Sequence, residues 1–166
     1  MPSRLLPIYL NDHLAGATLG LELVRRAQRE NEGTPLGDFL HGLANEIGED
    51  RRTLLQLMER LGIEPSRSKI AAARVTEKVG RLKLNGQLTG YSPLSRLVEL
   101  EGLSTGVQGK LSLWQVLGAC ADAEPALDKA ELARLEARAR SQLEGLEEHR
   151  VQAGREALVG QAASAT

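Results

Sequence analysis

One carboxylate interrupts an apolar pattern where a core side chain is expected. In the segment 35–61, apolar residues recur in steps of four and three, so at about 100° per residue they share one helix face, with Asp50 near its middle. Glu46 lies on the flank of that face, and Glu49 points to another side. A buried carboxylate is costly unless it is paired, hydrogen-bonded or bound to a cation. Asp50 therefore needs a partner, either a metal ion or a nearby arginine such as Arg138 in a buried ion pair.

Polar residues interrupt the apolar faces of the other predicted helices as well. In the segment 128–158, Gln142 and His149 occupy core-type positions, although a single His or Gln there is usually a hydrogen-bonded core residue. The first and third helices each have two apolar faces, so either face of each is a candidate for the core. Several oxygen and imidazole groups on facing helices are what di-metal carboxylate bundles need. The candidate metal ligands are Asp12, Glu46, Glu49, Asp50, Glu101, Gln142 and His149.

Helix-start signals locate the elements that must position these side chains. Thr34-Pro35 and Ser92-Pro93 each place an N-cap residue before a proline in the first turn, and Asp128 with Glu131 has the acidic form of a capping box. Gly62 is typical of a helix end. The pattern predicts long helices at 5–30, 35–61, 93–122 and 128–158, and a shorter one at 69–84.

The lengths of the connections predict an all-α, antiparallel four-helix bundle. Short loops join the first two helices and the last two, which favours two helical hairpins. The segment 66–91 is long enough to travel the length of the bundle between them. We expect one domain, 1–160, followed by a disordered tail of small residues, 161–166.

The composition indicates a cytoplasmic protein. Aromatic residues make up only 2% of the chain, so the core must be built from Leu, Ala and Val. A net charge of −1 gives no sign of nucleic-acid or membrane binding, and no apolar run approaches the length of a membrane span. The single cysteine, Cys120, excludes an intrachain disulfide and is expected to be a small buried hydrophobe.

Two pairs of glycines one turn apart interrupt the first and third helices. They are Gly16 with Gly20 and Gly102 with Gly106. Because glycine in a helix costs roughly 1 kcal/mol relative to alanine, we expect that backbones approach closely at these positions.

The segment 39–50 resembles the second helix of the ferritin-like superfamily, in which a Glu-x-x-His motif supplies a bridging carboxylate and an imidazole. Glu46 matches the glutamate, Glu49 stands where the histidine would be, and Asp50 lies beside it. Leu100-Glu101 is similar to the third-helix segment that carries another carboxylate, and Asp12 falls near the first-helix carboxylate. Gln142 lies where some ferritins have a glutamine and others begin a second motif.

The resemblance implies a ferritin-like fold and a metal site for iron, manganese or zinc. Neither the second nor the fourth helix has an intact Glu-x-x-His motif, so the site would be rich in oxygen and suited to a hard cation or to no metal. The alternative is a non-catalytic interaction or scaffold module whose polar core residues only set the helix register. If no partner charge is left unpaired, Asp50→Leu is expected to be neutral or stabilising.

The second apolar face of the first and third helices predicts a homodimer. One apolar face suffices for a bundle, and the surplus, including Ile8, Leu19 and Leu23, would form an exposed patch on a monomer. Light scattering at micromolar concentration should return the mass of a dimer. A monomer mass would contradict this prediction.

Overall fold

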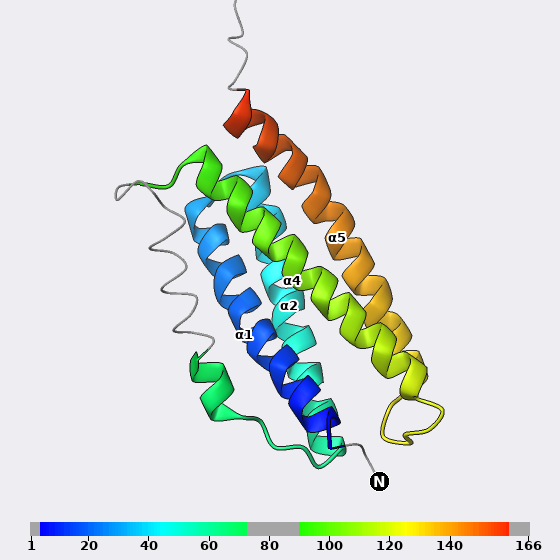
Figure 1. Ribbon diagram of the computed structural model, residues 1–166. Coiled ribbons are helices and arrows are strands. Elements are labelled where there is room, and N and C mark those ends of the chain that lie inside the picture. Colours follow the sequence, from blue (N-terminus) through cyan, green and yellow to red (C-terminus); the bar gives the residue numbers. More distant parts are fainter. Residues whose placement is uncertain (1–3, 73–89, 160–166) are drawn as a thin grey trace, which may run out of the picture.

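The computed structural model describes residues 4–72 and 90–159, and all of the regular secondary structure in these ranges is helical. Its long helices are α1 (Leu6–Glu30), α2 (Pro35–Arg60), α4 (Pro93–Cys120) and α5 (Lys129–Leu158), shown in Figure 1. Within these ranges there is no strand. Residues 67–72 are helical, whereas most of the predicted helix 69–84 and the predicted tail 161–166 lie outside the described residues. The all-α prediction is confirmed.

The predicted capping residues begin three of these helices. The Thr34 hydroxyl accepts a hydrogen bond from the backbone N–H of Gly37 (3.1 Å), and Ser92 caps α4 in the same way through Ser95. The Asp128 carboxylate accepts from two backbone N–H groups of the first turn of α5. These caps satisfy backbone donors that have no partner within the helix, so the helix starts follow from local sequence.

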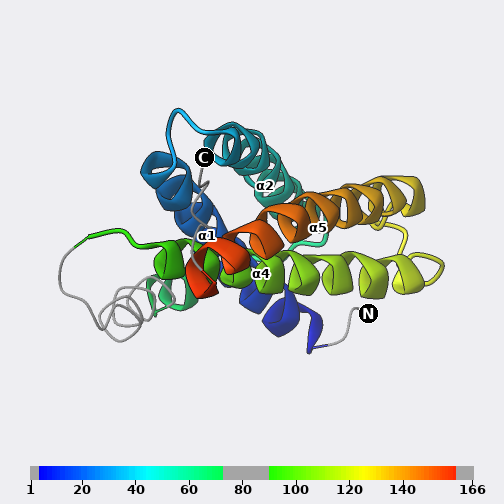
Figure 2. The same cartoon turned by 90° about the horizontal axis from the view of Figure 1, so that it is seen from above.

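The long helices form two hairpins that pack on each other. In each hairpin the two helices run in opposite directions, α1 against α2 and α4 against α5 (Figure 1). The second hairpin lies across the first at an inclined angle, as Figure 2 shows. Helix α4 packs on α1, and α2 meets α5 over a shorter stretch.

Packing selects one of the two apolar faces of α1 and of α4. In α1, Leu10 and Leu14 are fully buried, whereas Ile8 on the other face is 53% exposed. In α4, the face with Leu103 and Val107 is buried. The face that carries Leu94, Glu101 and Val116 points outward.

Cys120 is exposed, so the expectation of a buried thiol is wrong. It is the last residue of α4, one turn beyond Leu117, which is the last buried side chain of that helix. The helix ends here and a turn follows, so the thiol lies beyond the packed part of α4 and is left exposed.

A polar network joins α1 to α4 near the end of α1. Arg26 pairs with the buried carboxylate of Glu99 (2.6 Å), which also accepts a hydrogen bond from the Tyr91 hydroxyl (2.9 Å). Burial raises the pKa of Tyr91 to about 12, so its hydroxyl stays protonated and able to donate. Asn31 donates to the same hydroxyl and accepts from Arg96, which extends the network to the start of α4.

We predict that Gly37→Ala destabilises the protein by about 1–3 kcal/mol, the usual cost of overpacking. A Cβ at this position would overlap the backbone carbonyl oxygen of Asn31, which belongs to the turn between α1 and α2 and has no freedom to move aside. Urea unfolding measures the change. Gly42→Ala in the same helix is the control, because nothing lies within 4 Å of its Cβ position, and it should stabilise by up to about 1 kcal/mol. Equal stability of the two variants would contradict this account.

Candidate functional site

A buried ion-pair cluster joins α2, α4 and α5 at Asp50. The Asp50 side chain is only 3% exposed, and its Oδ2 lies 2.5 Å from Nζ of Lys110. Its other oxygen, Oδ1, accepts a hydrogen bond from the guanidinium of Arg138. Asp50 thus has the arginine partner that the ion-pair interpretation named, together with a lysine that it did not name.

Gln142 completes this cluster from α5. Its side-chain oxygen accepts from Lys110, and its amide nitrogen donates to Glu46 (2.8 Å) and, more weakly, to Asp50 (3.4 Å). The amide therefore bridges a cation and two carboxylates, which requires both its donor and its acceptor. This accounts for a glutamine that is 4% exposed in the core of the protein.

Lys110 was missed in the sequence, although a signal for it exists. The positions Leu103, Val107, Lys110 and Trp114 follow the same steps of four and three that identify Asp50 in α2. The neighbouring residue Leu111 also suits the apolar face and obscured the lysine. Burial lowers the pKa of Lys110, and the adjacent Asp50 carboxylate offsets part of this shift.

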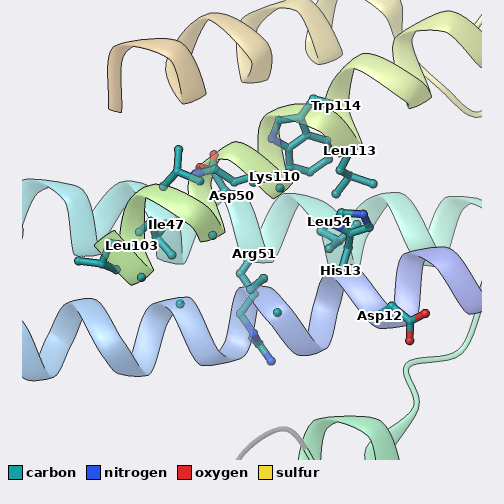
Figure 3. A pocket seen from close by; sticks show the side chains of 17 residues that line it. Asp12, His13, Ile47, Asp50, Arg51, Leu54, Leu103, Lys110, Leu113 and Trp114 are labelled. Carbon is teal, nitrogen blue, oxygen red and sulfur yellow. The ribbon is translucent and has the colours of Figure 1, made fainter. Parts of the chain in front are cut away.

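Two of the candidate ligands face solvent and pair with surface cations. Asp12 has a 61% exposed side chain and pairs with Lys69 at 2.6 Å; Figure 3 shows it pointing away from Asp50. Glu101 has a 52% exposed side chain and lies 3.8 Å from Arg150. The structure therefore does not bring these carboxylates into the Asp50 cluster.

The remaining candidates lie at the margin of the cluster or away from it. Glu49 is half exposed and accepts from Arg138 (2.9 Å), so it joins the cluster only through that arginine. His149 packs its ring against Phe39, with centroids 4.6 Å apart. Across the described ranges, no three His, Cys, Asp or Glu side chains are grouped so that they would hold a metal ion.

A cleft of about 300 Å³ lies between α1 and α4, with α2 at its base. Its lining is mainly apolar, and the Asp50–Lys110 pair forms part of one wall (Figure 3). The lining nearest to the Arg26–Glu99 pair is Gly20 of α1 and Gly102 of α4, and the cleft follows both helices away from that pair. The lining residues of α1 and α2 are Asp12, His13, Gly16, Ala17, Gly20, Ile47, Asp50, Arg51 and Leu54, and those of α4 are Gly102, Leu103, Gly106, Val107, Gly109, Lys110, Leu113 and Trp114.

Glycines open this cleft, which corrects the expectation that backbones approach closely at them. A Cβ on Gly16, Gly20 or Gly106 would meet nothing within 4 Å. Only Gly102 is in close contact, and its neighbour is a side chain, that of Leu23, at 3.3 Å. The inclined crossing of α1 and α4 leaves space where a parallel packing would have brought the backbones together.

Polar side chains border the cleft on α1 and α2. The His13 ring packs edge-on against Tyr9, and burial lowers its pKa, which favours the neutral imidazole. Arg51 donates from Nε to the buried hydroxyl of Thr18 (3.0 Å), which ties α2 to α1. The border of the cleft is therefore organised by a ring contact within α1 and a hydrogen bond between α1 and α2.

Comparison of the chain with protein-family models, with curated proteins and with solved structures returns no match. Among the helices that the structure describes, none has the length and apolar character to cross a membrane. The cluster and the cleft are therefore the features of the molecule that bear on its function.

We predict that Asp50→Leu destabilises the protein by about 3–5 kcal/mol, because it leaves the buried Lys110 ammonium without its carboxylate. Asp50→Leu would be neutral only if no partner charge were left unpaired, and Lys110 is such a partner. Asp50→Leu combined with Lys110→Met should recover most of the loss, since it removes both charges. Urea unfolding of the two variants is the measurement. If Asp50→Leu alone were as stable as wild type, the ion pair would not be what holds Lys110 in the core.

Proposed function

We propose that this protein is a helical binding protein that holds a small, mainly apolar molecule in the cleft between α1 and α4. The observation that carries the proposal is the cleft itself, whose volume of about 300 Å³ is at the lower end of the range for small-molecule sites. Its walls combine apolar side chains with a few fixed polar groups, which is the usual composition of such sites.

The energetics of the glycines support a role for the open space. Gly16, Gly20, Gly106 and Gly109 all lie within helices, and a Cβ on each would meet nothing within 4 Å. Each costs roughly 0.8–1 kcal/mol of helix stability relative to alanine, and neither close packing nor a turn requires any of them. A binding cleft gives these four costs a common explanation, since larger side chains would project into it.

We further propose that the helices adopt the ferritin-like arrangement with an ion-pair cluster in place of a metal centre. In support, α1 runs antiparallel to α2 and to α4, and a long connection separates the two hairpins (Figure 1). Glu46 lies at a position that the ferritin-like resemblance assigns to a ligand, and Asp50 lies beside another, which Glu49 occupies. The cations Lys110 and Arg138 already contact the Asp50 carboxylate and would repel a metal ion at that point, so the donor set does not fit a di-metal site.

Metal binding is the alternative, and heating curves separate the two hypotheses. A metal bound only by the folded state at a hundredfold excess over its dissociation constant adds about 2.7 kcal/mol, or roughly 5–10 °C in Tm. Iron, manganese or zinc should give no such rise if the cluster is an ion-pair network. A rise that Asp50→Leu abolishes would favour the metal site.

A homodimer is a second candidate arrangement, favoured by apolar side chains on the outward faces of α1 and α4. Ile8, Leu94 and Val116 are each about half exposed. The exposed apolar surface is smaller than the sequence suggests, because Leu19 and Leu23 are half buried. Leu23 packs on Gly102 of α4.

We predict that Gly106→Leu weakens the binding of naphthalene by about tenfold or more without lowering stability. The new side chain would occupy the cleft, and an overpacking cost of 1–3 kcal/mol corresponds to about a tenfold or larger change in affinity. Stability is kept because nothing contacts this position and leucine is a better helix former than glycine. Proton–nitrogen correlation spectra of the cleft residues follow the binding.

Gly42→Leu is the matched control, since it makes the same substitution at an exposed helical glycine of α2 outside the cleft. It should leave the naphthalene affinity unchanged. Equal affinity of wild type and Gly106→Leu, or shifts confined to residues outside the cleft, would contradict the proposed function.

A further inference from the structure

One buried hydrogen-bond donor in the wall of the cleft has no acceptor. Trp114 is 1% exposed and lines the cleft, yet its indole nitrogen, Nε1, donates to no group in the described part of the protein. Figure 3 shows the nitrogen on the edge of the ring that is turned toward Lys110. A buried donor without an acceptor costs about 1–3 kcal/mol, and the indole N–H of a buried tryptophan usually finds a partner.

Lys110 offers a second donor on the same side of the cleft. Its ammonium group has three N–H donors, and two of them are used by Asp50 and Gln142. The remaining donor and the indole N–H belong to residues one helical turn apart on α4, so the two side chains are neighbours in the wall of the cleft. Because Nε1 is itself buried, an acceptor atom in the cleft reaches it only through a small shift of the ring, and it then satisfies a donor that has no partner among the described residues.

The charges around this point favour an uncharged acceptor. The cluster contains the cations Lys110 and Arg138 and the carboxylates Asp50, Glu46 and Glu49. Lys110 and Arg138 are already paired with carboxylates, and Arg51, the other cation of the lining, points away from Trp114 in Figure 3, so an anion at this point would lack a counter-charge of its own. A carbonyl oxygen accepts a hydrogen bond without adding charge.

We propose that the cleft recognises a small, uncharged, mainly apolar molecule that carries a carbonyl-type oxygen, which accepts a hydrogen bond from the Trp114 indole N–H. The apolar body lies along the glycine-lined part of the cleft, and the oxygen lies beside Trp114 and Lys110. This inference rests on the proposed function of the cleft and adds the chemistry that selects its ligand.

Three probes of equal heavy-atom count test the proposal on the full chain. They are acetylnaphthalene, its isopropenyl hydrocarbon analogue and the naphthoate anion, which differ only in the polar group. Trp114 is the single tryptophan of the chain, so its indole N–H gives one cross-peak in proton–nitrogen spectra. Ring-current shifts from the naphthyl group are common to all three probes. Acetylnaphthalene should move this peak further downfield than the hydrocarbon does, because only the ketone accepts its hydrogen bond.

Affinities provide the second measurement. The ratio of acetylnaphthalene to hydrocarbon affinity should fall about two- to tenfold in Trp114→Phe, the factor expected for one hydrogen bond. Naphthoate should bind about tenfold or more weakly than the ketone, since a buried anion beside carboxylates is unfavourable. The shift of the indole peak is measured on the wild-type protein, so it tests the proposal even if Trp114→Phe packs poorly.

The outcomes distinguish the two proposals. If ketone and hydrocarbon shift the indole peak equally, or if naphthoate binds most tightly, carbonyl recognition is wrong while binding in the cleft stands. If none of the three probes shifts the resonances of the cleft residues, the proposed function fails as well.

Discussion

A carboxylate in the interior of a helical protein needs a compensating charge or hydrogen bonds, and the packing of this protein depends on the cations that pair with Asp50. Lys110 comes from α4 and Arg138 from α5, so the pairing aligns three helices at one level. Apolar side chains would fill the same space at similar stability, but they would tolerate a shift of one helix along another. The charged contacts do not, because a shift of one turn would leave a buried charge unpaired.

The cleft follows from this constraint. The Arg26–Glu99 pair holds α1 against α4 at one end, and the Asp50 cluster holds α4 on α2 farther along. Between these points the inclined crossing separates α1 from α4, and the glycines leave the space empty. A cleft whose walls are tied by ion pairs is already organised before a ligand arrives, which reduces the ordering cost of binding.

The same polar cluster connects the architecture with the proposed chemistry. The residues that resemble ligands of a di-metal site are compensated by cations, so the cluster serves as a structural element and as one wall of the cleft. Its hydrogen bonds use two of the three Lys110 donors, and the Trp114 indole N–H, which has no acceptor among the described residues, belongs to the same wall of the cleft. Selectivity for a ligand would then depend on the few donors that folding leaves unused.

The sequence alone determined the helices and the interior place of Asp50 and Gln142, because capping and 3.6-residue periodicity are local properties. The signals Thr34-Pro35 and Ser92-Pro93 mark helix starts that the structure confirms. Only the tertiary structure decided which apolar face of α1 and α4 is buried, and therefore that Asp12 and Glu101 face solvent. Two apolar faces on one helix are equivalent until a neighbour packs on one of them. A helical glycine is likewise ambiguous in sequence, since a missing side chain permits either close contact or an open cleft, and the inclination of the hairpins selects the cleft here.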